Sequence, residues 1–570
     1  MKPFWITFYS YKGGVGRSLA LANIAALLVN RGRRVALIDF DLEAPGLDSF
    51  EEFKCVASKP GVVEYVTEFK STRRAPDISQ FTHPCELPGP LRGKLWIMPA
   101  GKKDAAYNSL RANLHWVRLY DSGLGEPFVE NWKAAIARHC QPDYVFVDSR
   151  TGLTDVAGIC TLHLPDLVVM VFGLNDQNVK GIAAVAKTIR ESESTRIPQL
   201  HYVASPLPNL TREKRGPLTK RLTAAASHLG VKFKSTLRYQ AAAALNEKLF
   251  VLEDEFEASP LVEDYEDLLG RLIEYNRTGL DFLLKQTRGA ISEVDNELKT
   301  RLLAVLRQEF PERAESLMAQ AQLKKALGDS NGAIAAAREA LEADPTLGNA
   351  LDWLLDNYRR LRDFKAALSL CDMVLQHADR LSPHRRYNLH SERGHIAMAA
   401  GEYAAATESY SKCISHLAEN KKKGDVDPEL VMINMFNDCE ANRRLSGEPL
   451  TTLWRTVLNL FKMTGDASAE PLVLQANRWQ AMHIPFAMTG HHERAREALT
   501  KARQAAQLLG IAEDIFTVRT YTDVPVKEFL KNNDEMLAAL DRGQLWDGMP
   551  LPTVKPQDES RLEGDPELEV

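Results

Sequence analysis

The chain has 570 residues, of which 45% are hydrophobic and 26% are charged, and its formal net charge is -5. This length predicts two or more domains with room for substantial buried cores. The nearly balanced charge gives no support to general nucleic-acid binding, and no apolar run approaches the roughly 18 residues that a membrane-spanning helix needs.

A glycine-rich loop is the first informative feature. It occupies residues 10–18, SYKGGVGRS, between a predicted strand at 4–9 and a predicted helix at 19–29. Its three glycines let backbone N–H groups approach a ligand closely, and the helix N-terminus adds unpaired donors and partial positive charge. Ser18 stands where phosphate-binding loops place the hydroxyl that reaches Mg²⁺, and Arg17 stands where they normally have lysine. A turn without a ligand would not need two cations and a hydroxyl at this spacing, so the pattern favours phosphate binding.

Lys12 narrows this prediction to one family. The loop resembles the deviant Walker A motif of the MinD/ParA ATPases, whose signature lysine precedes two glycines. The resemblance implies an ATP-dependent homodimer in which two subunits enclose two ATP molecules and Lys12 reaches the nucleotide of the partner. Arg17 departs from the motif, because a guanidinium is planar and forked where an ammonium is compact, and this departure leaves hydrolysis open. The residues that the resemblance implies at the ATP are Lys12, Gly13, Gly14, Val15, Gly16, Arg17, Ser18 and Leu19.

Two predicted buried strands end in acidic residues. Residues 34–39 lead into the segment FDLEAPG, which is similar to switch I of the family, and residues 143–148 resemble a Walker B strand. Taken singly, each aspartate is more typical of a turn or a helix cap, and their order along the chain is what favours metal and nucleotide roles. The implied roles are Mg²⁺ binding by Ser18, Asp39 and Asp148, and catalysis by Lys12 and Asp41, with Asp41 orienting the attacking water.

Further predicted strands at 94–100, 166–172, 199–204 and 232–237 alternate with helices. This alternation predicts an α/β doubly wound, mostly parallel sheet of the P-loop NTPase type over residues 1–285. In relatives, the loop after the strand at 199–204 helps to hold the adenine. Pro206 and Asn209 are therefore candidate nucleotide contacts, although ordinary turn chemistry explains them equally well.

Arg150 follows the predicted Walker B strand and has two interpretations. Its guanidinium could bind phosphate charge, or it could pair with a nearby carboxylate. The sequence does not choose between them.

The second half of the chain predicts an all-α helical-repeat solenoid over residues 286–545. Ala367 follows Ala333 by 34 residues, which is the period of the tetratricopeptide repeat, and similar segments recur at 401–406 and 490–495. Small alanines let paired helices approach closely enough to stack. The alternative is a nonrepeating helical bundle that is rich in alanine. Residues 546–570 predict an acidic disordered tail, unlike the amphipathic helix through which MinD-like proteins bind membranes.

The seven cysteines are scattered and form no C-x-x-C pair. This pattern predicts a reduced, cytoplasmic protein without zinc. Thr151 stands near the place where related iron proteins have a cluster-binding cysteine, which argues against an iron–sulfur cluster. The first predicted strand begins at once, so we expect no signal peptide.

These features predict a switch that binds ATP and Mg²⁺, dimerises with nucleotide, hydrolyses ATP slowly, and binds a protein partner through its helical repeats. The main alternative is a non-hydrolysing ATP-binding scaffold in which Arg17 grips the nucleotide. A protein-tyrosine kinase of similar fold is less favoured, because no tyrosine follows Tyr521. A chromosome-partitioning role rests on fold analogy alone, since the chain shows no basic arm or DNA-reading helix. The combination of modules resembles components of bacterial signalling or phage-defence systems.

Overall fold

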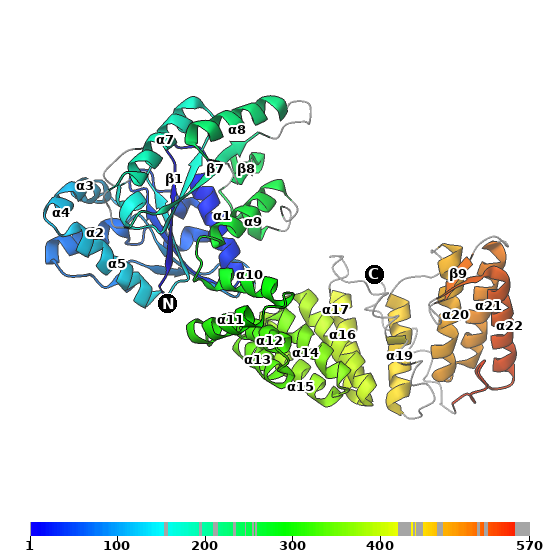
Figure 1. Cartoon of the computed structure of the whole chain (residues 1–570). Coiled ribbons are helices and arrows are strands. Elements are labelled where there is room, and N and C mark those ends of the chain that lie inside the picture. The colour runs from blue at the N-terminus through cyan, green and yellow to red at the C-terminus, as the bar shows by residue number, and fades with distance from the viewer. Residues whose placement is uncertain are drawn as a thin grey trace. The chain divides into compact units, whose positions relative to one another are not determined.

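The structure is a computed structural model, shown in Figure 1. It describes residues 2–89, 91–152, 158–192, 196–208, 215–231, 235–244, 247–253, 256, 259–419, 435–436, 439, 448–463, 471–509, 514–517 and 522–552. The chain divides into two compact units, Met1–Ala336 and Ala337–Val570. The first unit therefore extends beyond the predicted 1–285 domain and includes the helices that immediately follow it.

An eight-stranded sheet forms the centre of the first unit. All neighbouring strands pair in parallel except β3 and β4, which are antiparallel. Across the sheet the strands are β3 (His83–Cys85), β4 (Lys94–Met98), β2 (Arg34–Phe40), β5 (Tyr144–Ser149), β1 (Phe4–Tyr9), β6 (Leu167–Phe172), β7 (Gln199–Leu207) and β8 (Ser235–Arg238). This order confirms the doubly wound fold, and it places the loop after β1 at the carboxyl ends of the central strands, where such sheets bind ligands.

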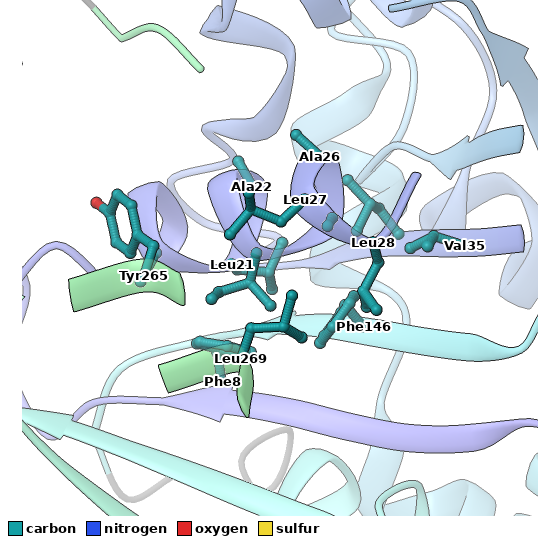
Figure 2. Packing of buried hydrophobic residues seen from close by; sticks show 14 of the residues in the cluster. Phe8, Leu21, Ala22, Ala26, Leu27, Leu28, Val35, Phe146, Tyr265 and Leu269 are labelled. Carbon is teal, nitrogen blue, oxygen red and sulfur yellow. The ribbon is translucent and has the colours of Figure 1, made fainter. Parts of the chain in front are cut away.

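The central strands β1, β5 and β6 are largely apolar and buried because helices cover both faces of the sheet. On one face, Phe8 of β1 and Phe146 of β5 pack against Leu21 and against Leu269, as Figure 2 shows. Leu21 belongs to α1 (Arg17–Asn30), of whose fourteen residues eleven are buried, and Leu269 belongs to α9 (Pro260–Ile273). The other face packs on α2 (Val62–Thr72), α4 (Trp116–Asp121), α5 (Gly125–His139), α7 (Asp176–Arg190) and α8 (Arg215–Leu229).

Three helices complete the compact part of the first unit: α10 (Leu280–Ile291), α11 (Asn296–Glu309) and α12 (Ala314–Ala326). They share a small apolar core of their own. Ion pairs join them to the sheet, because Arg33, which precedes β2, donates to Asp281 of α10 at 2.9 Å and to Glu315 of α12 at 3.1 Å. The position of these helices is therefore set by buried charge as well as by apolar packing.

Among the described residues that follow, helices predominate, as predicted. After α13 (Ser330–Ala343), the helices are α14 (Gly348–Arg360), α15 (Phe364–Leu375), α16 (Pro383–Ala400), α17 (Tyr403–Glu419), α19 (Glu448–Met463), α20 (Leu472–Met488), α21 (His492–Leu509) and α22 (Val526–Asp541). A short antiparallel pair, β9 (Asp514–Thr517) with β10 (Thr522–Pro525), lies between α21 and α22 and has no counterpart in the predicted elements. None of the described helices is long and apolar enough to cross a bilayer.

The alanines of the sequence repeat occupy one structural position. Ala333, Ala367, Ala406 and Ala495 are each the fourth residue of their helix, in α13, α15, α17 and α21 respectively, and each is fully buried. A methyl group at this position lets the neighbouring helix approach closely, which is the role that the repeat pattern indicates.

The helical unit continues past residue 545. Gln544 pairs with Pro550 in an isolated bridge, and Met549 and Leu551 pack against the apolar core of this unit. The predicted tail, 546–570, therefore begins with packed residues, and its part from 553 onward lies outside the described residues.

Candidate nucleotide site

A cavity of about 530 Å³ opens at the carboxyl ends of the central strands. This volume lies within the range of small-molecule sites. Of the residues predicted at the nucleotide, Gly13, Gly14, Val15, Gly16, Arg17, Ser18, Leu19, Asp41 and Pro206 line it. Lys12, Asp39 and Asp148 do not line it, and Asn209 lies outside the described residues. The folded chain thus brings most of the predicted site to one cavity.

The loop between β1 and α1 has the backbone of a phosphate cradle. Gly14 and Gly16 both adopt φ of 76°, a left-handed conformation that favours glycine. A Cβ atom placed on Gly13 or Gly14 would meet no atom within 4 Å, so the space over the loop is open. No side chain caps the N-terminus of α1, which leaves its backbone donors free for an anion. The Ser205 hydroxyl donates to the Val15 carbonyl at 2.8 Å and anchors the loop.

Arg17 turns toward the acidic strand ends. Its Nε donates to Asp148 Oδ1 at 2.6 Å and its Nη2 donates to Asp41 Oδ2 at 3.0 Å. The side chain is only 8% exposed. Burial opposes the charged guanidinium, but the two carboxylates outweigh it and raise the pKa of Arg17. One cation thus bridges the end of β5 and the segment that follows β2.

Asp39 adds a third buried carboxyl group beside this pair. It accepts hydrogen bonds from the backbone N–H groups of Asp41 at 3.1 Å and Leu47 at 3.3 Å. Burial, together with the charges of Asp148 and Asp41, raises the pKa of Asp39 to about 8. Burial likewise raises the pKa of Asp148, although Arg17 opposes that shift. The site concentrates more negative charge than Arg17 neutralises, which is an environment suited to a second cation.

Among the described residues around the cavity, buried polar atoms without hydrogen-bond partners include Ser10 Oγ, Arg17 Nη1 and Asp148 Oδ2. Within the described residues, no group of three or more His, Cys, Asp or Glu side chains forms a closed metal cage. Mg²⁺ in nucleotide sites commonly uses one or two carboxylates together with substrate phosphates. A free oxygen on Asp148 and the Ser18 hydroxyl at the cavity wall fit that open kind of site.

Lys12 differs from the rest of the loop. It is exposed, and its Nζ donates to Gln177 Oε1 at 2.5 Å in the first turn of α7. The ammonium therefore stands beside the cavity and faces solvent.

Arg150 pairs with a carboxylate. Of its two interpretations, phosphate binding and carboxylate pairing, the structure shows the second. Its Nη2 contacts Glu43 Oε2 at 2.5 Å. Glu43 also contacts Arg111 at 3.4 Å, so the segment after Asp41 is tied to two basic residues.

One wall of the cavity was missed by the sequence reasoning. It comprises Arg238, which ends β8, Tyr239 and Gln240, which follow β8, and Glu247. Arg238 is held by Asp264 of α9 at 2.8 Å. The signal that could have found this wall is positional, because residues that follow a parallel strand share the ligand-binding edge of the sheet.

The chain matches the family profile CbiA, described as the CobQ/CobB/MinD/ParA nucleotide binding domain, over residues 6–448. Its structure is similar to the cell division ATPase MinD of Pyrococcus furiosus, with 16% identity, a TM-score of 0.37, and coverage of 48% of this chain and 99% of that one. It is also similar to a plasmid partition protein from Borrelia burgdorferi, with 17% identity, a TM-score of 0.34, and coverage of 48% and 99%. A third similar structure is McdA of Cyanothece in complex with ATP, with 12% identity, a TM-score of 0.38, and coverage of 48% and 97%. Comparison with curated proteins gave no match. Because the profile spans more than half of the chain, the protein belongs to the CobQ/CobB/MinD/ParA nucleotide-binding domain family.

Proposed function

We propose that the protein is an ATP-dependent dimerisation switch that hydrolyses ATP slowly. The observation that carries this proposal is the contrast between Lys12 and the rest of its loop. Gly13 to Leu19 line the cavity, whereas Lys12 faces solvent beside it. A lysine that served only the nucleotide of its own subunit would gain most by pointing into the cavity. An exposed ammonium at the rim suits contact with a nucleotide held by a second copy of the chain.

The nucleotide binds, in this proposal, with its phosphates on the backbone of Gly13, Gly14 and Gly16 at the N-terminus of α1. Ser18, Asp148 and Asp39 would hold Mg²⁺, which would supply positive charge to neutralise the phosphates. The base lies toward the wall formed by Pro206 and Tyr239, which line the same cavity.

Hydrolysis requires a water molecule opposite the leaving group. Asp41 lines the cavity and is 8% exposed, and this position supports the proposed role of its carboxylate in orienting that water. The water oxygen bonds to the γ-phosphorus, the bond from that phosphorus to the β–γ bridging oxygen breaks, and ADP and phosphate leave as a proton passes to solvent. Arg17 holds Asp41 at 3.0 Å, and this competing ion pair is our reason for proposing slow turnover.

A non-hydrolysing scaffold is the second candidate. The same ion pairs favour it, because Arg17 engages both Asp148 and Asp41 and so occupies the carboxylates that turnover would use. In that case ATP would hold a dimer together without being consumed.

The helical repeats have the same proposed role in both candidate functions. We propose that they bind a protein segment, since stacked helical repeats present extended surfaces of the kind that bind peptides. A nucleotide switch joined to such an arm suits a signalling or defence component, in which the bound state of one module controls a partner of the other.

The deciding experiment measures the mass of the full chain in solution with no nucleotide, with ADP, and with ATP and Mg²⁺, together with phosphate release. We expect a dimer only with ATP, and slow phosphate release. A dimer without phosphate release would favour the scaffold. A chain that stays monomeric with ATP and releases no phosphate would overturn both candidates.

A further inference from the structure

Two thiols meet where the segment that follows Phe50 packs on the edge strand β3. Cys55 Sγ lies 2.7 Å from Cys85 Sγ, although the residues are 30 positions apart in sequence. Cys55 is exposed and Cys85 is buried. The other five cysteines, Cys140, Cys160, Cys371, Cys413 and Cys439, are all buried. Cys55 is therefore the one exposed residue among the seven cysteines, and its sulfur already has a second sulfur in contact.

The pair joins two structural elements. Cys55 lies in the 3₁₀ segment η2 (Glu51–Val56), and Cys85 ends β3, the antiparallel edge strand of the sheet. The Cys85 thiol also donates to the Glu52 carbonyl at 3.2 Å, which holds β3 against η2. A covalent bond between the sulfurs would reinforce a contact that the fold already makes, because a disulfide needs sulfurs at about 2.05 Å and only a small further approach.

The η2 segment also borders the nucleotide cavity. It directly follows Phe50, which lines the cavity together with Ala44 and Gly46 of the preceding loop. Glu52 accepts a hydrogen bond from the Leu249 backbone N–H at 3.1 Å, close to Glu247, a residue of the opposite wall. A change in the mobility of η2 would therefore affect residues on two walls of the cavity.

We propose that Cys55 and Cys85 form a redox-controlled disulfide site, with a low-molecular-weight disulfide of the glutathione class as oxidant. The bond fastens η2 to β3 and restrains the Asp41–Phe50 wall of the cavity. Reversible pairs of this kind are the form in which disulfides occur in reducing compartments.

The chemistry proceeds by two thiol–disulfide exchanges. The Cys55 thiol gives up its proton and the resulting thiolate attacks the small disulfide, so that a mixed disulfide forms, the small S–S bond breaks, and the leaving thiolate takes up a proton as the first small thiol. The Cys85 sulfur then attacks Cys55 Sγ, the bond to the small molecule breaks, and the proton of Cys85 passes to the leaving thiolate. The protein loses two electrons and two protons, and the oxidant becomes two thiols. Burial raises the pKa of the Cys85 thiol, which agrees with Cys55 acting first and Cys85 second.

Mass spectrometry of the full-length protein tests the site without reference to nucleotide. The wild-type chain is incubated with oxidised glutathione, digested without reduction, and mapped. We expect a peptide joined through Cys55 and Cys85, no retained glutathione, and reversal by a reducing thiol. Cys85→Ser should keep glutathione on Cys55, and Cys55→Ser should remain unmodified. Stable glutathione on Cys55 of the wild type, or no reaction of Cys55, would overturn the proposal, and this wild-type result decides even if Cys85→Ser does not fold.

The effect on the cavity rests on the proposed function, so it is measured separately. Release of a fluorescent ATP analogue should be slower from the oxidised chain than from the reduced chain. Cys55→Ser should release the analogue as fast as the reduced wild-type chain, whether or not it has been treated with the oxidant. Equal release rates from the two forms would overturn the coupling to the cavity. If the reduced chain binds no analogue, the proposed function is wrong. Peptide mapping still tests the disulfide site in that case, because it does not depend on nucleotide binding.

Discussion

Arg17 donates its Nε to Asp148 Oδ1 at 2.6 Å, so the cation of the phosphate-binding loop is directed at the end of β5. Lysine at this position would present one ammonium to the phosphates, whereas the forked guanidinium also reaches Asp41. The loop cation and the acidic strand ends are therefore one electrostatic unit, because Arg17 pairs with both Asp41 and Asp148.

Arg17→Lys tests this unit. A lysine ammonium cannot bridge the two carboxylates in the same forked geometry, so Asp148 and Asp41 lose a shared buried partner. We expect phosphate release to fall by about tenfold or more, which corresponds to about 1.4 kcal/mol in the barrier. Steady-state phosphate release is the measurement. Arg150→Lys, at an arginine that pairs with Glu43, is the matched control and should stay close to wild type. A large gain of activity in Arg17→Lys would instead support the scaffold.

Lys12→Ala separates dimerisation from nucleotide binding. Lys12 faces solvent beside the cavity, so its removal should abolish the ATP-induced increase in mass while the chain still binds ATP. Light scattering and a binding assay on the same sample measure the two properties. Lys187→Ala, at an exposed lysine of α7 that pairs with Glu191, is the control. Normal dimerisation of Lys12→Ala would contradict the proposed role.

Asp281→Asn tests the buried ion pair that joins α10 to the sheet. Asp281 accepts from Arg33 at 2.9 Å and from the Tyr144 hydroxyl at 2.9 Å, and both charged side chains are almost fully buried. Loss of the carboxylate charge leaves Arg33 buried with less compensation, so we expect a loss of about 3–5 kcal/mol in the free energy of unfolding. Urea unfolding checks this value. Asp267→Asn removes an exposed partner of Arg271 and should cost less than about 1 kcal/mol. Similar losses of unfolding free energy in the two variants would show that burial does not set the contribution of the Arg33–Asp281 pair to stability.

His390 of α16 predicts a pH dependence of stability. Burial, with the nearby charges of Lys412 and Arg393, lowers its pKa from 6.5 to about 4. Between these values the unfolded chain binds a proton that the folded chain does not, so stability falls as the pH drops from 6.5 toward 4. Thermal unfolding at several pH values should show a smaller decrease for His390→Gln than for wild type. The exposed His139→Gln variant serves as control, and an unchanged profile in His390→Gln would refute the assignment.

Ala367→Leu tests the repeat packing. Ala367 is fully buried at the fourth position of α15, where a larger side chain forces the neighbouring helix outward. Overpacking of this kind costs about 1–3 kcal/mol. Ala343→Leu, at an exposed alanine at the end of α13, is the control and should have little effect in a thermal unfolding assay. Equal stability of the two variants would argue against close helix approach at Ala367.

Local patterns in the sequence were sufficient for the elements of the fold and for much of the candidate site. The predicted strand at 4–9 coincides with β1, and the acidic residues 39 and 148 lie at the ends of neighbouring parallel strands. These features can be predicted from the sequence because buried strands are continuous apolar runs. The glycine, hydroxyl and acidic residues can be recognised because each has a fixed position next to a predicted strand or helix. The repeat alanines were also readable, since Ala367 follows Ala333 by 34 residues, the period of the tetratricopeptide repeat.

Tertiary structure alone decided which groups meet. Arg17 pairs with Asp148 across 131 positions, Lys12 with Gln177 across 165, and Cys55 with Cys85 across 30. Nothing in the local pattern distinguishes these partners from other residues of the same kind. Their meeting depends on strand order in the sheet and on the packing of helices and loops around it, which are determined by burial of the whole apolar surface. The sequence by itself determined that the chain has a phosphate-binding loop with arginine in place of lysine, and the folded chain decided that this arginine lies against the carboxylates.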